Sequence, residues 1–196
     1  MRAGFAAHFA AVLSFVTVLP GCAARVSTFD ITDFREPGDA KRYRETFDEG
    51  YYALDGDGNV DVVLCRMTAP GDDAAGREIN QVIHIRSVWR SIPGDTVSHA
   101  TQINATVRYH ILSGRVGAAF EGAGSVFFSR DLRSDELTGT LELAKLRPKG
   151  RVAAANSLFR HAEIAGAFVA RHDPRRVVQI VNEMNRRFEP TPRGPE

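Results

Sequence analysis

The sequence predicts a mainly β fold, either an antiparallel β-sandwich or an open curled barrel of about six to eight strands, with one C-terminal amphipathic helix packed on it. Three features predict this class. From residue 47 onward, apolar residues recur at every second position, as in strands with one buried face. Clusters of Gly, Asp and Asn interrupt this alternation where a chain can reverse. Near the C-terminus the apolar spacing changes to the helical period.

The first two strands are expected at 49–54 and 60–67, as a hairpin around the turn 55–59. Acidic and amide residues alternate through this turn as in a calcium-binding loop. However, Val60 stands where such a loop needs glycine, and Arg66 stands where a glutamate closes the ligand shell. We therefore predict a turn. Cys65 lies within the apolar run of the second strand and is expected to be buried.

The clearest alternation belongs to the next two strands, which share apolar faces at Ile83, Ile85 and Trp89 and at Ile103, Ala105, Val107, Tyr109 and Ile111. We expect them to pair antiparallel around the loop 92–100, with Ile85 opposite Tyr109. That register also opposes Arg86 and Arg108, so the alternative shifts the pairing by two residues and puts Ile85 opposite Ile111.

The other face of this strand pair carries His84, Arg86, Arg108 and His110, the candidate ligand face. In the first register the two histidines are neighbours. Spacing suggests no third metal ligand and the arginines oppose a cation, so no metal site is predicted. An anionic ligand, such as a lipid head group or an acidic glycan, fits the arginines better. The alternative is a solvated sheet face without a ligand.

Four glycines, Gly114, Gly117, Gly122 and Gly124, precede an apolar run at 126–128 and predict that the sheet curls there. Two further strands are expected near 137–146 and 158–170. The spacing forms no phosphate-binding loop and no nucleophile elbow. We predict no catalytic residues and no cofactor.

The C-terminal helix is expected at 174–187, because Asp173 is a good N-cap and Pro174 suits a first helical residue. Its apolar stripe is expected to pack on the sheet; it comprises Val177, Ile180, Val181, Met184 and Phe188. Prolines then end regular structure and predict a disordered tail at 189–196.

The first 21 residues have the order of an export signal, with Arg2 before an apolar run that ends at Leu19. The run is shorter than the about 20 apolar residues of a membrane-spanning helix. The segment Leu19-Pro20-Gly21-Cys22 resembles the lipobox of bacterial lipoproteins, which usually carry a small or β-branched residue in place of Pro20. An ordinary cleaved signal with a coincidental cysteine is the alternative.

The resemblance implies that residues 1–21 are removed and that Cys22 carries a thioether-linked diacylglycerol and an amide-linked acyl chain such as palmitate. Such a lipid anchors the chain firmly to a membrane. In Gram-negative lipoproteins an aspartate after the lipidated cysteine favours the inner membrane. The residue here is Ala23, which favours the outer membrane, on its periplasmic or surface face.

The organisation expected after the signal is a lipidated and partly docked tether at 22–46, then a single β-rich domain at 47–188. If Cys22 is lipidated, Cys65 has no partner in the chain, since the sequence has two cysteines. Its 25 basic and 24 acidic side chains nearly balance, which argues against a nucleic-acid partner.

Three function classes remain open. The first is a non-enzymatic binding or structural module of the cell envelope, which meets the membrane through its covalent lipid and another envelope protein, lipid or glycan through its domain. The second is a carrier of a lipid or other apolar ligand, which requires an apolar cavity. The third is a hydrolase, which requires a histidine, a carboxylate and a serine or water in one cleft.

Overall fold

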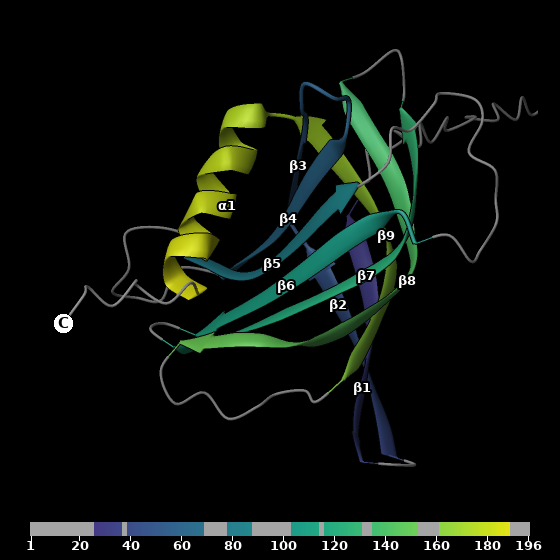
Figure 1. Cartoon of the computed structure of the whole chain (residues 1–196), viewed down its shortest axis with the longest axis vertical. Coiled ribbons are helices and arrows are strands. Elements are labelled where there is room, and N and C mark those ends of the chain that lie inside the picture. The colour runs from purple at the N-terminus through teal and green to yellow at the C-terminus, as the bar shows by residue number, and fades with distance from the viewer. Residues whose placement is uncertain are drawn as a thin grey trace, which may run out of the picture.

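The computed structural model describes residues 26–36, 39–68, 78–87, 103–113, 116–130, 135–152 and 161–188. This part of the chain is mainly β, with nine strands in one mixed sheet and one C-terminal helix, so the predicted fold class is confirmed (Figure 1). The predicted signal, Cys22, Trp89 and the predicted tail lie outside the described residues. No helix in the described ranges is long and apolar enough to cross a membrane.

The elements follow one another as β1 (Ser27–Glu36), β2 (Asp39–Phe47), β3 (Glu49–Leu54), β4 (Val60–Thr68), β5 (Glu78–Ser87), β6 (Ala105–Ser113), β7 (Val116–Arg130), β8 (Glu136–Val152), β9 (Ala162–His172) and α1 (Pro174–Phe188). The predicted hairpin β3–β4 is present, and Gly58 in its turn has a φ of 81°. The helix begins as predicted, with the Arg176 backbone N–H donating to Asp173 Oδ1 at 3.0 Å.

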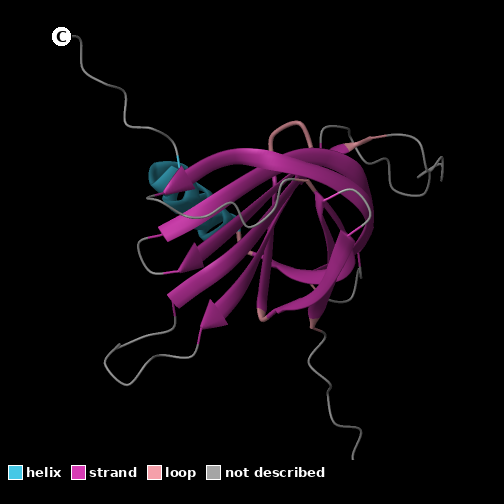
Figure 2. Cartoon of the chain, turned by 90° about the horizontal axis from the view of Figure 1, so that it is seen from below, coloured by secondary structure: helices cyan, strands magenta, loops and turns pink. Residues whose placement is uncertain are grey.

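The strands from β3 to β9 form a ring, because β9 pairs with β8 on one edge and with β3 on the other (Figure 2). Neighbours along the chain are antiparallel from β3 to β9, whereas β3 and β9 run parallel over two residue pairs. β1 pairs with the first part of β9, and the β1–β2 hairpin projects beyond the ring at the bottom of Figure 1.

The short seam between β3 and β9 depends on a close backbone approach at Gly50. A Cβ atom added there would lie 2.1 Å from the Val169 carbonyl oxygen and 3.2 Å from Ala170 Cα. Beyond the paired residues, the Asp173 N–H donates to the Tyr52 carbonyl at 3.0 Å. A side chain at position 50 would therefore push apart the two strands that close the ring.

The inside of the ring is filled by alternate side chains of every strand around it. Phe29 and Phe47 from the β1–β2 hairpin contribute as well, with their rings edge to face at 5.6 Å. The buried members of this core are 0–5 % exposed. Since a side chain lining a water-sized cavity keeps accessible surface, such values indicate close packing in the opening between the ribbons of Figure 2.

A second core lies outside the ring, between α1 and the outer faces of β3, β4, β5 and β6 (Figure 1). The predicted helical stripe is confirmed: Val177, Ile180 and Met184 are buried there. Cys65 is a free thiol in this core and is fully buried, as predicted. Burial raises the pKa of Cys65 to about 12.

The predicted register of β5 and β6 is wrong, although the predicted inward face is right for Ile83, Ile85 and the β6 residues Ala105, Val107 and Tyr109. Ile103 precedes β6 and is exposed. Ile85 lies opposite Val107, and Tyr109 lies opposite Ile83. The partner of Ile85 is therefore two residues before the one first predicted and four residues before the one in the alternative register. This register separates the arginines. Arg86 pairs across to Asp61 on β4, and Arg108 pairs across to Glu121 on β7.

The stretch 22–46, expected as a partly docked tether, contains all of β1 and most of β2. The reason is the alternation of Phe29 and Ile31, which point into the ring core as β1 pairs with β9. β2 is the edge strand of the sheet and carries Lys41, Arg42 and Arg44. Charged side chains on an edge strand discourage pairing with a strand of another molecule.

Candidate functional site

The four residues of the candidate ligand face lie on the outer surface of β5 and β6, opposite the ring core. Strand alternation places them there, because Ile83, Ile85, Val107 and Tyr109 point inward. His84 lies opposite Arg108, and His110 lies opposite Val82, so the two histidines are not the direct neighbours that the predicted register required.

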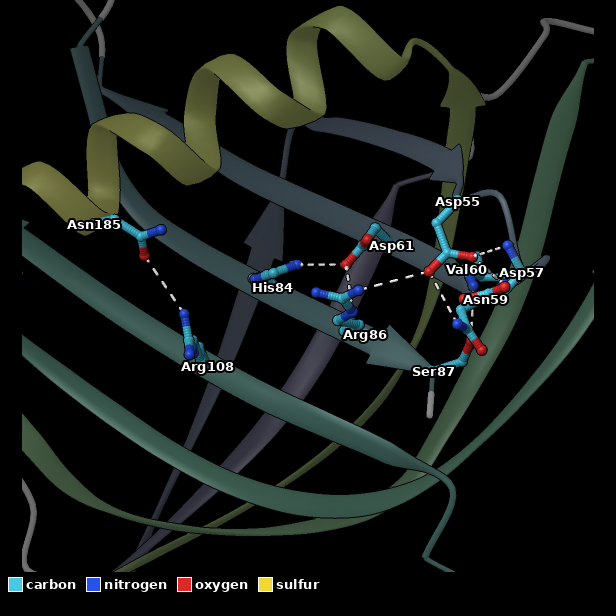
Figure 3. Close-up of polar contacts among 10 residues, drawn as sticks. All are labelled: Asp55, Asp57, Asn59, Val60, Asp61, His84, Arg86, Ser87, Arg108 and Asn185. Carbon is cyan, nitrogen blue, oxygen red and sulfur yellow. Dashed lines mark hydrogen bonds and ion pairs between the residues drawn. The ribbon is translucent and has the colours of Figure 1, made fainter. Parts of the chain in front are cut away.

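His84 and Arg86 form ion pairs with aspartates of β4 and of the β3–β4 turn (Figure 3). His84 Nε2 lies 2.9 Å from Asp61 Oδ1, and Arg86 Nε lies 3.9 Å from the same oxygen. The other end of the guanidinium is 3.5 Å from Asp55 Oδ2. Both basic side chains therefore have acidic partners within the fold.

The turn itself is organised by the Asp55 carboxylate, which accepts from the backbone N–H groups of Asp57 and Asn59 at 2.9 Å each. The Asn59 side-chain amide donates to the second oxygen, also at 2.9 Å. These hydrogen bonds lower the pKa of Asp55, and the bond from the Asn59 side chain has the largest effect. The predicted turn is confirmed, and the Arg86 guanidinium lies where a bound cation would be repelled.

Arg108 belongs to a second ion-pair network on the same face of the sheet, which involves β6, β7 and α1. Its guanidinium lies 3.6 Å from Glu121 on β7. It also donates to the Asn185 side-chain oxygen of α1 at 3.4 Å, as Figure 3 shows. Lys149 on β8 also pairs with Glu121. One carboxylate thus serves two cations, and Arg108 ties the sheet to the last turns of the helix.

His110 is 6 % exposed and lies under the C-terminal end of α1, with its ring 4.9 Å from that of Phe188. Burial, and then the charges of His84, Arg108 and Lys149, lower the pKa of His110 to about 4. Its Nδ1 atom has no hydrogen-bond partner among the described residues, beside a cavity of about 40 Å³. That volume suffices for a water molecule.

The candidate ligand face is therefore two ion-pair networks and one buried histidine rather than a common binding cleft. The first network centres on Asp61, the second on Glu121, and His110 is covered by the helix. Nowhere in the described ranges do three His, Cys, Asp or Glu side chains gather closely enough to hold a metal ion.

Two arrangements were not predicted from the sequence, and the first is a stack at the start of α1. The Tyr51 ring lies under the guanidiniums of Arg171 and Arg176, at 4.8 and 5.8 Å from the ring centroid. The Tyr51 hydroxyl donates to Glu49 Oε2 at 2.6 Å and accepts from Arg171 at 3.1 Å. Burial, followed by the bond to Glu49, raises the pKa of Tyr51. This stack secures the β3–β9 seam and the helix start.

The second is an open apolar groove of about 430 Å³ on the β7–β8–β9 side of the molecule, lined in part by Val26, Phe127, Thr138, Thr140, Ala167 and Val169. Phe127, Thr140 and Ala167 lie side by side on three neighbouring strands. The sole sequence signal was that these residues are the outward members of their strands. Nothing in that pattern brings together segments so far apart in the chain.

No protein-family model matches this chain, and comparisons with curated proteins and with solved structures find no significant similarity.

Proposed function

We propose that this chain is a lipid-anchored protein of the bacterial cell envelope, and that its β domain is a non-enzymatic binding or structural module. The observation that carries the proposal is the lipobox-like segment Leu19-Pro20-Gly21-Cys22 directly after a short apolar run. A diacylglycerol with a further acyl chain on Cys22 holds a protein to a membrane far more firmly than one acyl chain.

The position of β1 supports a domain held close to the membrane. Val26 is the first described residue and Ser27 begins β1, so three residues lie between Cys22 and Val26, which are four residue steps apart. Four extended residues span at most about 14 Å. The lipid attachment point therefore lies within about 14 Å of the folded domain, much nearer than a free tether ending at residue 46 would place it.

The two other function classes receive less support. A carrier that holds its ligand inside the ring needs space there, whereas the core side chains are closely packed. A hydrolase needs a serine near a histidine and a carboxylate. His84 and Asp61 form such a pair on the outer face of the sheet, but Ser87 points from the opposite face of β5 and accepts from the Val60 N–H at 2.7 Å.

The proposal is tested by labelling bacteria that express the full chain with radioactive palmitate and following precursor processing and membrane sedimentation. The native chain should incorporate label, shorten and sediment with membranes. Cys22→Ser should remain unlabelled and keep its precursor length. Cys65→Ala is the matched control, since it removes the other cysteine, and it should behave as the native chain does. Unchanged processing and sedimentation of Cys22→Ser would refute the lipid anchor.

A further inference from the structure

The apolar groove lies beside the point where the N-terminal segment joins the domain. Val26 lines it, and Ser27 fixes the chain there, because its hydroxyl accepts from the Val169 N–H at 3.1 Å and donates to the Val169 carbonyl at 3.4 Å. The described part of the chain therefore begins at the edge of the groove.

The chemistry of the groove suits a hydrocarbon chain. Its described lining residues include Phe127, Ala167 and Val169 on the outer face, together with Phe128 and Phe168, which also belong to or pack on the ring core, and none of the described lining residues has an ionisable side chain. A quarter of the sequence is charged, so an uncharged hollow on the outer face of a sheet is unusual for this protein. Its volume of about 430 Å³ also falls within the about 300–1,000 Å³ of small-ligand sites.

The dimensions agree with an occupant attached at Cys22. From β1 across β9 and β8 to β7 there are three strand spacings of about 4.8 Å, or about 14 Å in all. An acyl chain of a bilayer leaflet covers half of a hydrocarbon core about 30 Å thick, or about 15 Å. The four residue steps from Cys22 to Val26 reach no farther than about 14 Å, so the lipid starts within that distance of the groove edge at Val26.

We infer that the groove over β7, β8 and β9 holds an acyl chain of the lipid that Cys22 carries. This inference rests on the proposed lipidation. One chain lies along the row Ala167, Thr140 and Phe127, with Val26 at its entry, while the remaining acyl substituents stay in the bilayer. The groove thus sets the face of the domain that rests against the membrane.

The test uses the full chain in bacteria supplied with a photoactivatable palmitate analogue. After irradiation of intact membranes, digestion and mass spectrometry locate both the label on Cys22 and its crosslinks. We expect crosslinks from the Cys22 lipid to peptides that contain Phe127, Thr140 or Ala167. Thr140→Lys should reduce them about tenfold, because an ammonium group in the groove resists burial beside hydrocarbon.

Thr106→Lys is the matched control, as Thr106 is also an exposed, outward-facing threonine but lies on β6. It should leave the crosslinks unchanged. A labelled Cys22 with crosslinks only to bilayer lipids would overturn the groove inference while leaving the lipid anchor intact. Groove adducts with the mass of a phospholipid would also overturn it, since the occupant would then come from the bilayer. An unlabelled Cys22 would overturn the proposed function itself.

Discussion

Gly50→Ala tests whether the ring depends on a backbone contact that allows no side chain. The new methyl carbon would lie 2.1 Å from the Val169 carbonyl oxygen, well inside van der Waals contact, and the obstructing atoms belong to the backbone of β9. β3 and β9 share two residue pairs, so neither strand can shift without loss of the seam.

Overpacking a well-packed site usually costs about 1–3 kcal/mol, and the rigid backbone obstacle places this substitution near the upper end, at about 3 kcal/mol. For a domain of this size each kcal/mol lowers the Tm by about 2–4 °C, so we expect a fall of about 6–12 °C. Thermal unfolding of the purified protein, followed by far-ultraviolet circular dichroism, measures the shift.

Gly56→Ala is the matched control. A Cβ atom at Gly56 meets nothing within 4 Å, and Gly58 is the residue of this turn with a positive φ. We expect its free energy of unfolding to change by less than about 1 kcal/mol. If the two alanine variants unfold at the same temperature, the close approach at Gly50 does not constrain the ring.

Three further predictions concern the helix and the second core. Cys65, whose pKa burial raises to about 12, should react with a thiol reagent only after unfolding, and rapid labelling of the native protein would contradict its burial. Asp173→Ala should lower the free energy of unfolding in urea by about 0.5–2 kcal/mol, because it removes the N-cap of α1; an unchanged midpoint would contradict the cap. The pKa of His110 is lowered to about 4, so the unfolded chain binds a proton at about pH 6.5 that the folded chain does not. The contribution of His110 to the free energy of unfolding is therefore fully present above pH 6.5. It should fall by up to about 3 kcal/mol as the pH drops toward 4. In denaturation curves over that range, His110→Gln should lose this component, whereas His161→Gln, at an exposed position, should keep it.

Local patterns predicted much of the fold. The strand expected at 49–54 matches β3, and the helix expected at 174–187 ends one residue before α1 does. Both elements are determined by residues close together in the sequence. The hairpin follows from alternating apolar residues around a turn, and α1 follows from an N-cap and helical apolar spacing. β1 was expected only as part of a tether, because its apolar residues find their partners on β9, far along the chain.

The register of β5 and β6 shows why pairwise reasoning was insufficient. Comparing only these two strands put Arg86 opposite Arg108. In the sheet, Asp61 on β4 and Glu121 on β7 provide the acidic partners, so four strands decide the register together. The observed register differs from the predicted one by an even number of residues, because an odd shift would have turned one apolar face to solvent.

The candidate site was less predictable than the fold. The sequence placed His84, Arg86, Arg108 and His110 on one face, but it did not reveal that carboxylates from β3–β4 and β7 partner the first three or that α1 covers His110. The groove depends on β7, β8, β9 and Val26 meeting in space. Such a site becomes visible only once the topology of the sheet is known.

The most direct test of the account is intact mass spectrometry of the protein extracted from bacterial membranes, with sequencing of its N-terminal peptide. We predict that the mature chain begins at Cys22 and carries a diacylglyceryl group with an additional acyl chain on that residue. A mature N-terminus at another residue, or an unmodified Cys22, would contradict the membrane attachment on which the proposed function depends.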